Sequence, residues 1–178
     1  ETRSMIGKSF RSDNKDKSIM RFMNGLKRDV SFLTIEREEN QNNTQYVYVP
    51  GVGRPRQIDS SEKQNDFEDT DLTNEDLGGR KIEDYDYERL KDAAVKIGGE
   101  SFDCYVVVAT NKNKDVKYPK SRFWIDKKTL IPVQYKTYGR DGKLKREGVS
   151  AQIKEVKPGI YRPFFMYAKD AERKHETK

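Results

Sequence analysis

Residues 131–168 read IPVQYKTYGRDGKLKREGVSAQIKEVKPGIYRPFFMYA. Apolar and polar residues alternate along Ile131–Tyr138, Leu144–Val156 and Ile160–Ala168, which is the period of a β-strand and not of a helix. The connections contain Asp141-Gly142 and Pro158-Gly159, whose residues accept the backbone conformations of tight hairpins. Strands joined in sequence by tight turns predict an antiparallel meander.

The same alternation continues through the rest of the chain. It predicts further strands at Arg3–Phe10, Lys17–Met23, Val30–Glu38, Thr44–Pro50, Arg54–Ile58, Ile82–Lys91, Phe102–Thr110 and Ser121–Asp126. A meander of this length tends to curl or close. We therefore expect a single domain over residues 1–178, mainly β (α+β), built on a strongly curved antiparallel sheet.

One acidic segment, Asp59–Leu77, lacks the alternation. Within it, Asp71–Leu77 is typical of a short helix that Gly78-Gly79 would end. Its apolar residues are few, namely Phe67, Leu72 and Leu77. A short amphipathic element between two halves of a curved sheet would cover the open mouth of that sheet. The alternative is that this segment is an ordinary surface loop.

The composition indicates a thin, aromatic core. Hydrophobic residues make up 33% of the chain and charged residues 37%, a balance that leans toward disorder. Eight Phe, ten Tyr and one Trp, most of them inside the strand-like runs, favour a folded domain instead. A thin core also fits a hollow protein.

Charge is distributed unevenly along the sequence. Residues 1–111 carry 17 basic and 22 acidic side chains, a net charge of −5, whereas residues 112–178 carry 19 and 8, a net charge of +11. The basic half could steer the protein toward phosphate, anionic lipid or an acidic partner. A well-solvated, lysine-rich surface would give the same numbers.

Few residues can support catalysis or bind a metal. His175 is the only histidine and Cys104 the only cysteine, so histidine-based triads and the usual zinc sites are excluded. Cys104 lies within a predicted strand, where a small core residue is expected. We predict no catalytic residues, no metal and no cofactor. An acidic cluster without the ligand spacing of a calcium loop is formed by Asp66, Glu68, Asp69 and Asp71.

Several predicted strands present apolar residues on both faces. Tyr46 and Tyr48, for example, alternate with Val47 and Val49. In a sheet with one solvated face, apolar and polar residues alternate cleanly along each strand. These strands do not, so both faces of their sheet need to be covered. Few helices are available to cover them. A hydrophobic guest is therefore expected, although an ordinary core role for each residue remains the alternative. The predicted lipid-binding residues are Phe22, Phe32, Tyr46, Tyr48, Val106, Phe123, Tyr135 and Phe165, with Phe67, Leu72 and Leu77 over the mouth.

Short motifs occur in a fixed order from about Ser18 to Glu176. They are Ser18–Phe22, Phe32–Glu36, Gln45–Pro50, Arg54–Ile58, Asp66–Leu77, Phe123–Thr129 with Pro132, Tyr138 with Asp141–Lys143, Tyr161–Pro163 and Met166. The ordered set resembles the outer-membrane lipoprotein-sorting family, which has the lipoprotein-localisation fold. Asp66–Leu77 is similar to that family's acidic loop and its Glu-Asp-Leu helix.

This resemblance implies an incomplete β-barrel of about ten strands with short helices covering the opening. It implies a periplasmic protein that holds acyl chains of lipoproteins or other lipids and transfers them between envelope membranes. Its partners would be an inner-membrane exporter or an outer-membrane acceptor. A lipid attached upstream of Glu1 could anchor the protein to a membrane. The family's opening helix and first strand are expected before Glu1, and a closing strand after Lys178.

Three other functions stay open at this point. The same fold could serve as an accessory or scaffold subunit of a lipid exporter without carrying lipid. Aromatic and basic residues on strands could instead bind single-stranded nucleic acid or another polyanion, but the acidic first half opposes a phosphate backbone, so no nucleic-acid partner is predicted. An enzyme is the least favoured alternative.

Overall fold

The computed structural model describes residues 4–12, 15–37, 43–78, 80, 82–171 and 175–177. The chain divides into two compact units: the first comprises Glu1–Glu68 and Thr73–Lys81, the second Asp69–Leu72 and Ile82–Lys178. Arg3, Glu38 and Gly79, which the sequence placed in strands or at a helix end, lie outside the described residues.

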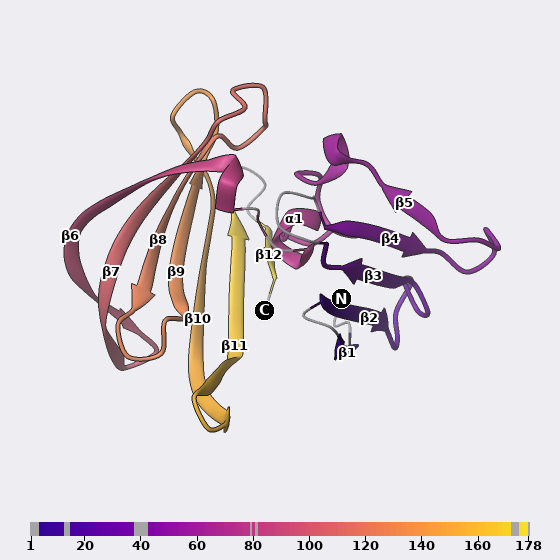
Figure 1. The fold of residues 1–178 in the computed structure, drawn as a ribbon, viewed down its shortest axis with the longest axis horizontal. Coiled ribbons are helices and arrows are strands. Elements are labelled where there is room, and N and C mark those ends of the chain that lie inside the picture. Colours follow the sequence, from indigo (N-terminus) through magenta and orange to yellow (C-terminus); the bar gives the residue numbers. More distant parts are fainter. Residues whose placement is uncertain are drawn as a thin grey trace. The chain divides into compact units, whose positions relative to one another are not determined.

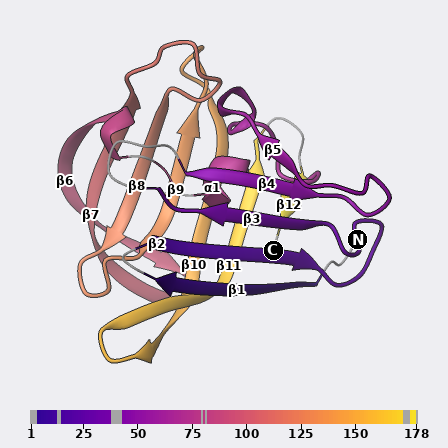
Figure 2. The ribbon, with the colours of Figure 1, turned by 45° about the vertical axis from the view of Figure 1, so that its right-hand side comes forward.

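The first unit is built on a five-stranded antiparallel sheet whose spatial order equals the sequence order, as Figure 2 shows. Pairing of Phe32 with Met20 on one side and Val47 on the other puts these three side chains on one face. Leu33, Ile19 and Tyr46 form the neighbouring row on the opposite face. The strands are β1 (Met5–Ser12), β2 (Lys15–Phe22), β3 (Ser31–Ile35), β4 (Thr44–Tyr48) and β5 (Arg56–Ile58).

The Phe32 face of this sheet is covered by the acidic segment that follows β5. The ring of Phe67 lies 4.2 Å from that of Phe32 and 5.9 Å from that of Phe22, measured between centroids. All three side chains are buried. Edge and stacked ring contacts of this kind add to the stability that burial gives. This aromatic cluster is the core of the first unit.

Helix α1 (Asn74–Gly78) is fixed at its start and along its side. The Thr73 amide donates to Asp76 Oδ2 at 2.9 Å and the Asp76 amide donates to Thr73 Oγ1 at 3.1 Å, a reciprocal capping box. Buried Gln45 of β4 donates from Nε2 to the Asn74 carbonyl at 2.8 Å. The 3₁₀ turn η1 (Ser60–Glu62) precedes the helix in the chain. The helix begins at Asn74, three residues later than predicted.

The second unit is a seven-stranded antiparallel sheet, ordered β12-β11-β10-β9-β8-β7-β6 (Figure 1). It is entered through the 3₁₀ turn η2 (Ile82–Asp84). Its strands are β6 (Tyr85–Ile97), β7 (Glu100–Asn111), β8 (Lys120–Asp126), β9 (Pro132–Tyr138), β10 (Leu144–Lys157), β11 (Ile160–Asp170) and β12 (His175–Thr177).

Glycines decide two local features of this sheet. Gly98 and Gly99 make the β6–β7 turn with φ values of 56° and 91°, a conformation that side chains with a Cβ rarely adopt. Gly148 of β10 lies opposite Tyr135 of β9, and a Cβ built on it would come within 2.4 Å of the tyrosine ring. The aromatic ring of Tyr135 therefore lies directly over the glycine backbone.

A buried polar anchor ties the segment Asp69–Leu72 to the second unit. The Arg146 guanidinium donates from Nη1 to the Asp71 carbonyl at 2.8 Å and lies 5.2 Å from the Tyr118 ring centroid. The hydroxyl of Thr177 in β12 donates to Asp71 Oδ2 at 2.9 Å. Arg146 and Asp71 are among the most deeply buried side chains. Burial of charged groups is tolerated because hydrogen bonds replace their lost hydration.

The prediction of a mainly β fold with antiparallel strands and few helices is confirmed. All eleven predicted strands have counterparts, but they form two open sheets; over the described residues neither sheet closes on itself. Strand β12 was not among the predicted strands. Among the helices of the described part of the chain, none is long and apolar enough to cross a membrane.

Candidate functional site

An open apolar pocket lies on the face of the first unit's sheet that Phe67 does not cover. It has a volume of about 490 Å³, within the range of pockets that hold small ligands. Ile19 and Tyr48 are 43% and 37% exposed, so solvent reaches its rim. The lining residues are Ile19, Ser31, Leu33, Tyr46, Tyr48 and Pro55.

The sheet register explains why these side chains meet. Ile19, Leu33 and Tyr46 are directly opposite one another on three adjacent strands, and Ser31 pairs with Tyr48 one row further along. Side chains in such cross-strand rows point to the same face. The wall is almost wholly apolar, and the hydroxyl of Ser31 is engaged with the Asp29 carbonyl at 3.0 Å. The pocket can therefore bury hydrocarbon but offers little for a polar ligand.

The predicted lipid-binding residues of the first unit are split between two faces. Tyr46 and Tyr48 line the pocket, as expected for residues that contact a guest. Phe22, Phe32 and Phe67 contact one another on the covered face. Phe67 was expected over the mouth of the cavity, but its ring is 1% exposed and packs on the side of the sheet away from the pocket.

The other two expected lid residues belong to different units. Leu72 lies in the segment Asp69–Leu72 of the second unit, whereas Leu77 lies in α1 of the first unit. Both side chains are half-buried. Leu72, Leu77 and Phe67 therefore do not belong to one helix or strand of the structure.

In the second unit, the predicted residues again fall on two faces. Phe123 is directly opposite Tyr135, so these two aromatic side chains share one face of the sheet. Val106 pairs with Trp124, the residue next to Phe123, and therefore points to the other face. Pairing continues from Trp124 through Gln134, Val149 and Tyr167, which places Phe165 on the Val106 face.

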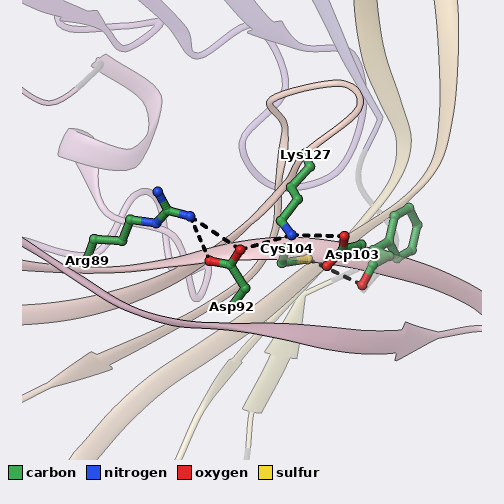
Figure 3. Close-up of polar contacts among 6 residues, drawn as sticks. Arg89, Asp92, Asp103, Cys104 and Lys127 are labelled. Atoms are coloured by element: carbon green, nitrogen blue, oxygen red, sulfur yellow. Dashed lines mark hydrogen bonds and ion pairs between the residues drawn. The ribbon is translucent and has the colours of Figure 1, made fainter.

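Tyr105 shares the Phe123 face and contacts two cations of an ionic cluster. Figure 3 shows the members of this cluster, Arg89, Asp92, Asp103 and Lys127. Lys127 Nζ is 2.9 Å from carboxylate oxygens of both Asp92 and Asp103, and the Arg89 guanidinium is 3.0 Å from Asp92. The hydrogen bond from Lys127, with help from Arg89, lowers the pKa of Asp92, and Asp92 raises the pKa of Lys127. The cations of Arg89 and Lys127 lie 4.7 and 5.5 Å from the Tyr105 ring centroid.

Cys104 lies in the middle of β7 and is fully buried. Burial, with the nearby carboxylates of Asp126 and Asp103, raises its pKa to about 11. Since the thiolate is the reactive form, this thiol is a poor nucleophile at neutral pH. Among the residues that the structure describes, no group of three or more His, Cys, Asp and Glu side chains is arranged to hold a metal ion.

Lysine side chains of β9 and β10 lie beside carboxylates. Lys136 follows Tyr135 in β9 and therefore points away from the face that holds Tyr135 and Phe123. Its Nζ lies 3.8 Å from a Glu147 carboxylate oxygen, and Lys145 pairs with Asp141 at 3.1 Å.

The sequence did not indicate four of the six lining residues, namely Ile19, Ser31, Leu33 and Pro55. The signal was present in the alternation, because Leu33 has the opposite parity to Phe32, and Ile19 the opposite parity to Phe22. A one-residue change in register exchanges the two faces, and the sequence alone does not fix the register. The pocket therefore emerges only from the observed pairing.

Comparisons with known proteins give a consistent likeness. A family model with the description "Uncharacterized protein" matches residues 14–178. A crystal structure of a domain assigned to outer membrane lipoprotein sorting in Vibrio parahaemolyticus is 26% identical, with a TM-score of 0.83; the match covers 96% of this chain and 72% of that one. The search among curated proteins gave no match.

Two more distant structures show a likeness of fold alone. A DUF1329 family protein from Desulfovibrio piger is 24% identical with a TM-score of 0.79, covering 98% of this chain and 73% of that one. A LolA superfamily protein from Nitrosomonas europaea is 18% identical with a TM-score of 0.63, covering 98% and 79%. The chain therefore has a LolA-like fold.

Proposed function

We propose, on the premise that this chain belongs to the lipoprotein-sorting-like family of uncharacterized proteins matched over residues 14–178, that it binds acyl chains of lipoproteins or other lipids. The observation that carries the proposal is the apolar pocket between Ile19, Leu33 and Tyr46. The protein acts by binding and release, and it is not an enzyme.

The pocket suits a hydrocarbon chain better than a polar ligand. Each methylene that moves from water into an apolar site contributes about 0.8 kcal/mol. An acyl chain needs no hydrogen-bond partner along its length, and the wall of the pocket offers almost none. Tyr46 and Tyr48 provide broad, rigid ring surfaces for such contacts. The ligand's polar end would remain at the open, solvent-exposed rim.

In the second unit, the aromatic face that carries Phe123 and Tyr135 would be a further lipid-contacting surface. We propose that a strongly curved sheet forms an incomplete β-barrel around the guest, with short helices at its opening. The periplasm, between the two envelope membranes, is the proposed location, since the relative from Vibrio parahaemolyticus is assigned to outer membrane lipoprotein sorting. An exporter or acceptor in those membranes would supply or receive the lipid.

A scaffold role without lipid transfer is the second candidate. The cluster of Phe22, Phe32 and Phe67 supports it, because these three side chains fill a core and leave no room for a guest between them. A protein that only docks an exporter needs such a core but no pocket. Ligand binding at Leu33 distinguishes the two functions.

Replacing Leu33 by asparagine is expected to weaken binding of a fluorescent fatty acid by about tenfold, because a polar side chain replaces apolar surface in the wall of the pocket. The measurement is a fluorescence titration of the purified chain with a dansyl-labelled fatty acid. The matched control is Val52→Asn, since Val52 lies in an exposed turn, 67% accessible, and does not line the pocket. Equal affinity in both variants, or no binding by the unaltered chain, would support the scaffold.

A further inference from the structure

The hairpin of β10 and β11 extends beyond the rest of the seven-stranded sheet, as Figure 1 shows. Pairing between β10 and β9 reaches only Val149 and Gln134 in this direction, whereas pairing between β10 and β11 continues to Lys157 and Ile160. Residues 152–164, here called the ribbon, therefore do not pair with β9. A two-stranded ribbon without other support is marginally stable in water.

The ribbon exposes large apolar side chains. Val156 and Ile160 at its tip are each 46% exposed and Phe164 is 59% exposed. Leu130, in the neighbouring β8–β9 turn at the same end of the sheet, is 67% exposed. At the opposite end of the sheet, residues 112–119 and 139–143 expose no large hydrophobic side chain, and Ile82 in η2 is exposed singly. Clustered apolar exposure of this kind marks an interaction site.

Basic residues accompany these apolar side chains. Arg162 is directly opposite Lys154, and both share a face with Phe164. The Lys154 ammonium lies 5.0 Å from the Phe164 ring centroid. No ion pair of Lys154, Lys157 or Arg162 with a carboxylate occurs among the described residues. Glu155, the one acidic residue of the ribbon, accepts the Gly159 amide at 2.7 Å.

We propose that the ribbon is a membrane-docking element, which inserts Val156, Ile160 and Phe164 into an anionic phospholipid surface while Lys154, Lys157 and Arg162 bind its headgroups. Apolar and aromatic side chains beside lysine and arginine are the chemistry of interfacial binding, and long basic side chains keep their charge at the headgroup level. This element serves a carrier and a scaffold equally, so the proposal does not depend on the pocket.

A lipid surface fits the ribbon better than a protein surface does. The tip carries apolar residues, and half-buried Ile153 and Tyr161 lie on the face away from Phe164, so a flat protein partner would cover only part of them. Strand addition along β11 is disfavoured because Pro163 interrupts its row of amide donors. A bilayer can take up apolar side chains from the tip and from both faces, while the long basic side chains reach back to the headgroups.

The test is vesicle flotation of the purified chain with phosphatidylglycerol–phosphatidylethanolamine vesicles and with phosphatidylcholine vesicles. The unaltered chain is expected to float with the anionic vesicles, and less so in high salt. Lys154→Glu with Arg162→Glu is expected to reduce the partition coefficient by at least about fivefold for each residue changed. Ile160→Ser with Phe164→Ser is expected to reduce it by about tenfold or more.

Two matched controls are expected to bind as the unaltered chain does. Lys114→Glu with Lys143→Glu makes the same charge change at the opposite end of the sheet, and Val52→Ser removes an exposed apolar side chain, 67% accessible, from the first unit. Equal losses in these controls, or no flotation of the unaltered chain, would overturn the proposal. So would a self-associated form, detected by ultracentrifugation without lipid, that the ribbon substitutions dissolve. Fatty-acid binding by the ribbon variants should stay unchanged, which separates this result from the fate of the pocket.

Discussion

Arg146→Ala is expected to lower the free energy of unfolding of the second unit by about 3–5 kcal/mol. Arg146 is 2% exposed, and its guanidinium holds the Asp71 carbonyl at 2.8 Å. Removing it leaves buried polar groups of the Asp71 segment without this donor and opens a gap beside Tyr118. Urea unfolding followed by the fluorescence of Trp124, the only tryptophan, reports directly on this sheet.

Arg162→Ala is the matched control for this prediction. Arg162 is an exposed arginine on β11, and its removal should change the free energy of unfolding by no more than about 0.5 kcal/mol. Arg146→Lys should recover only part of the loss, because an ammonium cannot reproduce the planar donor group. A loss below about 1 kcal/mol for Arg146→Ala would mean that the buried anchor does not hold the second unit together.

Phe67→Ala is expected to destabilise the first unit by about 3–5 kcal/mol. Its ring is buried between Phe22 and Phe32, so truncation removes the central member of the aromatic cluster and leaves a cavity. Chemical denaturation followed by circular dichroism gives the size of the loss. Hydrogen exchange of the β2, β3 and β4 amides localises it to this sheet.

Phe10→Ala provides the comparison, since Phe10 lies on β1 and is 65% exposed. Its removal should have little effect on the free energy of unfolding. The sequence placed Phe67 over the mouth of a cavity, where truncation would weaken lipid binding and spare the fold. If Phe67→Ala unfolds no more easily than Phe10→Ala but binds a fluorescent fatty acid less tightly, the core position of Phe67 is refuted.

The strands could be predicted because alternation and turn chemistry agree along most of the chain. The hairpin turns at Gly142 and Gly159 lie where the sequence indicated them. Strand β12 was not predicted because His175–Thr177 is polar throughout. The strand forms through its pairing with β11. Helix α1 begins late because Thr73 and Asp76 cap each other, whereas Asp71 is taken into the second unit.

The candidate site could be predicted only in part, because its residues depend on register. Tyr46 and Tyr48 were identified, but Leu33 was not, since either parity of β3 offers apolar side chains. Nor does the sequence indicate that the chain splits its strands into two sheets around the acidic segment. The burial of Arg146 was equally hidden, because an arginine in a sequence is expected at the surface.

The central claim, that the protein carries lipid in the Leu33 pocket, is tested most directly by mass spectrometry. The chain is purified without detergent from the periplasm of Gram-negative cells, and its organic extract is analysed beside that of Leu33→Asn. The proposal predicts near-stoichiometric acyl lipid with the unaltered chain and a marked depletion in the variant. An extract free of lipid, or the same lipid content in both proteins, would contradict it.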